Sequence, residues 1–177
     1  MASQQVMLLV VMLLGGVGVI GSYVQGFIAH HGCVNVLWGK ISGPFRSVYT
    51  VSMLLSALGY FAFAYFLLFR LVPSEVKVAG TLGFDVFFVV ITGMLLFSSL
   101  WMPFTYSYVE KMNSGTWAAI RIVLFLVALS SCALAWALLS LHIKQPAVPY
   151  WFAVAGSLYF AFHTTVLDAF IWPVIYK

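Results

Sequence analysis

The sequence is poor in charge, and above all in acidic residues. Only 7% of its 177 residues are charged, and Asp and Glu together number 4. Soluble domains carry about 25% charged residues, so this composition excludes a water-soluble fold. The few acids also exclude a carboxylate-rich cation site. The net charge of +4 is spread over separate loops, so we expect no nucleic acid partner.

The chain also lacks the short motifs that carry catalysis or metal binding. It contains no HExxH, no GxSxG, no glycine-rich phosphate loop and no Cys–His pairing at a usable spacing. Its two cysteines, Cys33 and Cys132, lie far apart and form no zinc-binding spacing. We therefore expect neither an enzyme nor a metal centre.

Long apolar runs fill the chain instead. Hydrophobic residues make up 64% of it, and a helix needs about 20 apolar residues to cross the hydrocarbon core of a bilayer. Five runs are long enough, at residues 6–29, 48–71, 80–104, 116–141 and 148–174. The polar segments between them are too short to fold alone. The sequence therefore predicts an all-α polytopic membrane protein, with residues 1–177 forming one domain, a five-transmembrane-helix bundle.

Five crossings place the two termini on opposite sides of the membrane. More basic residues fall on the side of the first loop and the C-terminus, and the positive-inside rule makes this side cytoplasmic. The first loop, residues 29–47, is the longest connection. Gly43 and Pro44 keep helices from closing over it, so it is either a lid on the bundle or a plain connector.

Ionisable residues inside a span are costly in lipid, and they are usually paired or turned toward a cavity. Arg121 lies about one and a half turns into the fourth span, and Asp168 lies at a similar depth in the fifth. We predict that these two residues form an ion pair, which either orients two helices or makes the charged floor of a ligand cavity. His163, in the middle of the fifth span, is either a buried hydrogen-bonded residue or a haem ligand.

Small residues form a stripe on the first span. Gly18, Ser22 and Gly26 recur at every fourth position, and such stripes let helix backbones approach closely. The stripe therefore predicts either a packing seam within the bundle or a homodimer contact.

Aromatic residues reach 18% of the chain, and several tryptophans and tyrosines lie deep in the spans. Their N–H and O–H groups need partners there, so a cluster of them favours a pocket lined by rings.

Several short stretches of the spans are distinctive: GSYVQG at residues 21–26, LLSALGY at 54–60, WMPF at 101–104, PY at 149–150 and YFAFHTT at 159–165. These stretches resemble the translocator protein family, also called tryptophan-rich sensory proteins. The resemblance implies a five-span bundle with a lipophilic-ligand cavity, beside which a proline breaks the third helix. The first loop lacks most of the family's Trp and Pro residues. Arg121 stands where the family has an acid, and Asp168 falls at or next to its asparagine.

Together these features predict binding, transport or sensing of a hydrophobic small molecule such as a sterol, a tetrapyrrole (haem or porphyrin) or a lipid. The expected lining residues are Trp101, Pro103, Trp136, Tyr159, Phe162 and His163, with Trp38 and Phe45 in the lid. The alternative is a non-catalytic accessory subunit of a larger membrane complex. A channel is less favoured, because the spans offer few polar wall residues. The endoplasmic reticulum and the mitochondrial outer membrane are both compatible locations.

Overall fold

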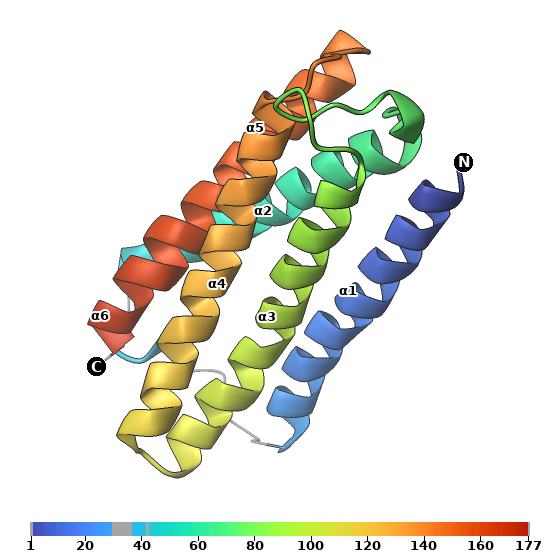
Figure 1. Cartoon of the computed structure of the whole chain (residues 1–177). Coiled ribbons are helices and arrows are strands. Elements are labelled where there is room, and N and C mark those ends of the chain that lie inside the picture. Colours follow the sequence, from blue (N-terminus) through green and yellow to red (C-terminus); the bar gives the residue numbers. More distant parts are fainter. Residues whose placement is uncertain (1, 30–36, 42, 177) are drawn as a thin grey trace.

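The computed structural model describes residues 2–29, 37–41 and 43–176, and this part of the chain is built from long helices (Figure 1). They are α1 (Ser3–Ala29), α2 (Gly43–Phe69), α3 (Asp85–Glu110), α4 (Ser114–Leu139) and a last span made of α5 (Ala147–Phe162), η3 (His163–Ile171) and α6 (Trp172–Tyr176). Within the described residues, five helices are long and apolar enough to cross a membrane. The predicted all-α, five-span membrane bundle is confirmed.

The third span differs most from its predicted bounds. The predicted run covered residues 80–104, whereas α3 runs from Asp85 to Glu110 and passes straight through Pro103. Proline removes one backbone hydrogen bond, but membrane helices tolerate it because neighbouring groups compensate for the freed carbonyl. The helix break expected at this proline is therefore absent from α3.

The helices follow one another around the bundle in an order that differs from the chain order. α1 packs against α3, α3 against α4, α4 against the last span, and the last span against α2, while α1 and α2 make fewer contacts. The side of α2 that carries buried polar residues therefore faces the last span, which is the pair of elements that builds the site described below.

The contact between α2 and α5 depends on two glycines. A Cβ atom added at Gly59 would lie 2.5 Å from the carbonyl oxygen of Gly156, and one added at Gly156 would lie 2.7 Å from that of Gly59. The two backbones thus touch directly at this level, as small residues allow in membrane bundles.

The glycine stripe of α1 faces α3 in the same chain. Gly26 is buried against the ring of Tyr106, and a Cβ atom added at Gly18 would lie 3.7 Å from Cβ of Ser99. The stripe of Gly18, Ser22 and Gly26 therefore contributes to a seam within the bundle, one of the two alternatives. The homodimer stays a prediction.

The connections gather at the two ends of the bundle as predicted (Figure 1). The described residues of the first loop, the turn between α3 and α4, and α6 share one end, opposite the N-terminus. Here the indole N–H of Trp172 donates to the carbonyl of Leu37 at 3.1 Å, and the ring of Trp117 stacks on that of Tyr176. We call this the C-terminal end. Its orientation toward the cytoplasm stays a prediction.

Candidate functional site

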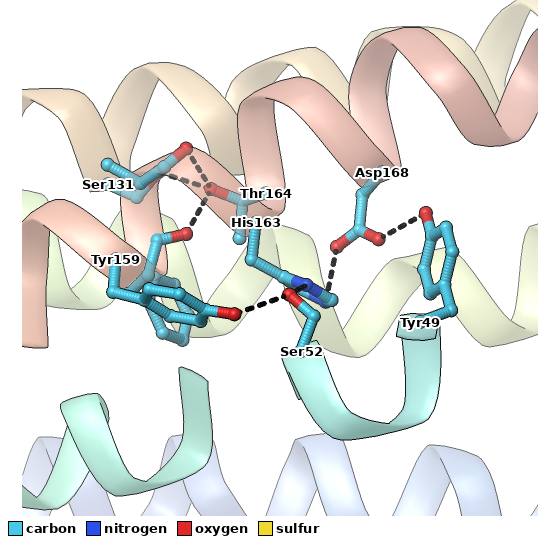
Figure 2. A network of polar contacts seen from close by, with 9 residues as sticks. Tyr49, Ser52, Ser131, Tyr159, His163, Thr164 and Asp168 are labelled. Atoms are coloured by element: carbon cyan, nitrogen blue, oxygen red, sulfur yellow. Dashed lines mark hydrogen bonds and ion pairs between the residues drawn. The ribbon is translucent and has the colours of Figure 1, made fainter. Parts of the chain in front are cut away.

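A line of polar side chains joins α2 to the last span (Figure 2). The hydroxyl of Tyr159 donates to Oγ of Ser52 at 3.1 Å, and this oxygen lies 2.9 Å from Nδ1 of His163. Nε2 of His163 lies 3.6 Å from Oδ2 of Asp168. The hydroxyl of Tyr49 donates to Oδ1 of Asp168 at 3.0 Å. We call these five residues the polar network.

The contacts in the polar network are compatible with one consistent set of donors and acceptors. Because Tyr159 already donates to Ser52, the hydroxyl hydrogen of Ser52 can point at Nδ1 of His163. A neutral imidazole then carries its proton on Nε2, the nitrogen that faces Asp168. Their 3.6 Å separation is too long for a hydrogen bond but short enough for electrostatic attraction. With this tautomer of His163, the donors all point toward the carboxyl group of Asp168.

The backbone of η3 explains why His163 and Asp168 face the same way. η3 is π-helical, and the N–H of Trp172 bonds to the carbonyl of Leu167, five residues earlier. In an α-helix a step of five residues is about 1.4 turns, so His163 and Asp168 would diverge. Hydrogen bonds between residues five apart widen the helical turn, so that two residues five apart lie more nearly on the same face of the helix. π-Helical turns are frequent at functional sites.

A second polar contact holds η3 on its other side. Oγ of Ser131 in α4 lies 2.6 Å from Oγ1 of Thr164, which also donates to the carbonyl of Phe160 at 3.0 Å. Thr164 is the neighbour of His163, so η3 is fixed both to α4 and to α2 (Figure 2). This leaves the imidazole little freedom to turn away from the polar network.

Asp168 is the open end of the polar network. The side chain of His163 is 7% exposed, whereas that of Asp168 is 29% exposed. Among the described residues, no Lys or Arg lies within the 4.0 Å of an ion pair from Asp168. An acid in a membrane span that has no cationic partner usually faces a cavity or a pathway.

Aromatic rings surround the Asp168 end of the network. The ring of Tyr49 lies edge-on to those of His163, Trp38 and Phe45, with centroids 5.7, 6.0 and 6.2 Å apart. Tyr49 thus links the polar network to two aromatic residues that the sequence placed in a lid. The guanidinium of Arg46 lies 4.7 Å from the centroid of the Trp38 ring and covers it.

Trp101 extends this aromatic surface across the bundle. Its ring lies 5.8 Å from that of Tyr23 in α1 and 5.7 Å from that of Trp172 in α6. Its indole N–H is buried and meets no hydrogen-bond partner in the described part of the chain, which leaves a donor available inside the bundle. Trp101 and Trp172 belong to the same apolar cluster as Trp38 and Tyr49, and we call these four residues the aromatic cluster.

The structure brings some of the predicted lining residues together and leaves others apart. Trp38, Phe45, Trp101, Tyr159 and His163 lie in or beside the polar network and the aromatic cluster. Phe162 touches the ring of Tyr159 but is 48% exposed, and Pro103 is exposed on α3. Trp136 is also 48% exposed and lies near the opposite end of α4.

The structure gives Asp168 other partners than the predicted one. Arg121 is exposed on α4, beside a groove toward the last span. Asp168 instead points toward α2, where Tyr49 binds it. Equal depth in the two spans was a sound expectation, but the π-helical turn directs Asp168 away from α4. The predicted ion pair is therefore replaced by the polar network.

Two members of the polar network were missed in the sequence. Tyr49 and Ser52 lie near the start of α2, and no motif marks them. A signal was nevertheless present, because Tyr49, Ser52, Ser56 and Gly59 recur at helical spacing and are all buried on one face of α2. Polar and small residues along a single face of a span are typical of helix contacts within a membrane.

These features define a multi-pass membrane protein with a polar site that aromatic rings border. Comparison of the chain with protein-family models, curated proteins and solved structures finds no match. The translocator resemblance accordingly stays a prediction.

Proposed function

We propose that the protein binds a hydrophobic small molecule within its bundle, with the polar group of the ligand at Asp168 and its apolar body against the aromatic cluster. The observation that carries this proposal is the partial exposure of Asp168, which ends the polar network without meeting a cation among the residues that the structure describes. Binding sites for small molecules are typically apolar and aromatic, with a few convergent polar groups that fix the ligand's orientation.

The chemistry of Asp168 narrows the class of ligand. An ionised carboxylate only accepts hydrogen bonds, and its two oxygens offer about four acceptor positions. Tyr49 occupies one of them, so a ligand that donates a hydrogen bond fits the remainder. A hydroxyl group, as in a sterol, or a protonated amine meets this requirement. A porphyrin's carboxylates would bring like charge to Asp168, so a tetrapyrrole fits less well.

Two further observations support binding. The buried indole N–H of Trp101 offers a donor to an acceptor group elsewhere on the ligand. The resemblance to the translocator family implies the same kind of cavity.

Ser52, His163 and Asp168 follow the hydroxyl–imidazole–carboxylate order of a nucleophilic triad. However, Ser52 is 4% exposed within α2 and its oxygen already accepts from Tyr159, so binding is favoured over acyl transfer.

Equilibrium binding of a radiolabelled sterol to the purified protein in mild detergent tests the proposal. We expect saturable binding that Asp168→Ala weakens by about tenfold or more, because a hydrogen bond to a charged group contributes about 1.5–3 kcal/mol. Asp85→Ala is the matched control, since Asp85 is an exposed acid at the far end of α3. It should leave the affinity unchanged.

Two results would reject the proposal. One is the absence of saturable binding for a sterol, a lipophilic amine and a porphyrin alike. The other is equal weakening by the two aspartate variants, which would locate the effect outside the polar network. Co-purification with a large stoichiometric complex would instead support the accessory-subunit alternative.

A further inference from the structure

Arg121 lies beside a groove that the polar network does not use. The groove has a volume of about 330 Å³ and is open on one side. It runs between α4 and the last span, and its lining residues are Trp117, Arg121, Ala169, Phe170, Pro173 and Val174. Arg121, Phe170 and Val174 are exposed, so the groove faces outward, toward the lipid.

The position of Arg121 along α4 places its charge below the membrane surface. A helix of 26 residues is about 39 Å long, against about 30 Å for the hydrocarbon core. Arg121 follows the first residue of α4, Ser114, by about 10 Å, so its Cα lies inside the apolar layer near the C-terminal end. A cation at such a depth is costly unless it reaches a partner. Among the described residues, Arg121 has neither an ion pair nor a side-chain hydrogen bond.

We propose that this groove binds an anionic phospholipid, with the lipid phosphate on the guanidinium of Arg121 and an acyl chain along the groove. A guanidinium matches a phosphate through two parallel hydrogen bonds. Ala169 and Pro173 have no long side chains that would fill the groove, and Phe170 and Val174 are exposed apolar residues for a chain to lie against. The groove therefore offers one charged end and an apolar length, as a phospholipid requires.

Native mass spectrometry of the detergent-purified protein tests this proposal. Phosphatidylglycerol and phosphatidylcholine with identical acyl chains compare an anionic with a zwitterionic headgroup, and glycerol phosphate supplies the headgroup chemistry without chains. We expect about a fivefold preference for phosphatidylglycerol over phosphatidylcholine, as one cation beside an anionic lipid gives. Glycerol phosphate should not bind at the same concentration.

Four variants locate the effect. Arg121→Gln should abolish the preference, and Arg121→Lys should keep part of it. Lys111→Gln removes the same charge from an exposed position at the same end of the bundle and should change nothing. Ala169→Leu fills the groove without altering charge and should reduce phosphatidylglycerol binding. Melting curves establish that each variant is folded.

Several results would overturn the proposal. Equal binding of the two lipids would mean that Arg121 meets any phosphate at the surface. If Lys111→Gln lost the preference for phosphatidylglycerol as Arg121→Gln does, the preference would be a general effect of charge. Binding of glycerol phosphate at the same strength would identify a site for free phosphate. Unchanged binding in Ala169→Leu would show that the groove holds no acyl chain.

Discussion

The direct contact between Gly59 and Gly156 leads to a sharp prediction. In Gly59→Ala the new Cβ atom would lie 2.5 Å from the carbonyl oxygen of Gly156, against about 3.4 Å for ordinary van der Waals contact. Its neighbour is rigid backbone rather than a movable side chain, so α2 and α5 must separate by most of an ångström. Ser52 lies two turns away on the same face of α2, so its contact with His163 should loosen as well.

The expected magnitude comes from comparison with a matched glycine. Overpacking a close contact costs about 1–3 kcal/mol, while alanine in place of glycine favours a helix by about 1 kcal/mol. Gly21→Ala in α1 makes the same change where no atom lies within 4 Å of the added Cβ atom. It should therefore show only the stability gained from the higher helix propensity of alanine. The free energy of unfolding of Gly59→Ala should therefore fall below that of Gly21→Ala by about 1–3 kcal/mol.

Unfolding by sodium dodecyl sulphate, followed by circular dichroism in mixed micelles, measures this difference. Gly156→Ala should behave as Gly59→Ala does, because the contact is reciprocal. Equal stability of Gly59→Ala and Gly21→Ala would refute the close α2–α5 packing, and with it the geometry that holds Ser52 against His163.

Three further predictions follow from the structure. Ser52→Ala should lower the free energy of unfolding by about 1–3 kcal/mol in the same titration, because it leaves buried His163 and half-buried Tyr159 without their partner; no change would argue against the network. Arg121→Leu should not lower the free energy of unfolding, since Arg121 is exposed, whereas loss of a buried ion pair would lower it by about 3–5 kcal/mol. In a background without native cysteines, Lys40→Cys and Ser114→Cys should react with an impermeant thiol reagent from one side of the membrane and Ser74→Cys from the other. Labelling of Lys40→Cys and Ser114→Cys from opposite sides would contradict the five-span arrangement.

The overall fold could be predicted from the sequence because the bilayer constrains it strongly. Each span must be a helix about 20 residues long or more, and runs of that length are visible directly in the composition. The residues at which each helix begins and ends were predicted less accurately, as α3 shows. The helix continues past Pro103 to Glu110, although the apolar run ends near this proline.

The site was only partly predictable. The polarity of His163 and Asp168 within an apolar span identified both as unusual, and the aromatic residues indicated a pocket. The partner of Asp168 could not be read from the sequence, because η3 departs from the α-helical period on which the comparison with Arg121 relied. Trp136 shows the converse error, since a tryptophan within a span can simply be exposed at the outer surface.

Contact quenching of tryptophan by a brominated sterol tests the proposed site most directly. Trp38 and Trp101 belong to the aromatic cluster, whereas Trp136 and Trp151 are exposed and should meet bromine only by non-saturable contact in the micelle. We expect a saturable component of quenching that the double variant Trp136→Phe/Trp151→Phe retains and Trp38→Phe/Trp101→Phe loses in large part. Quenching that never saturates, or a saturable component carried by Trp136 and Trp151, would contradict a ligand site within the bundle.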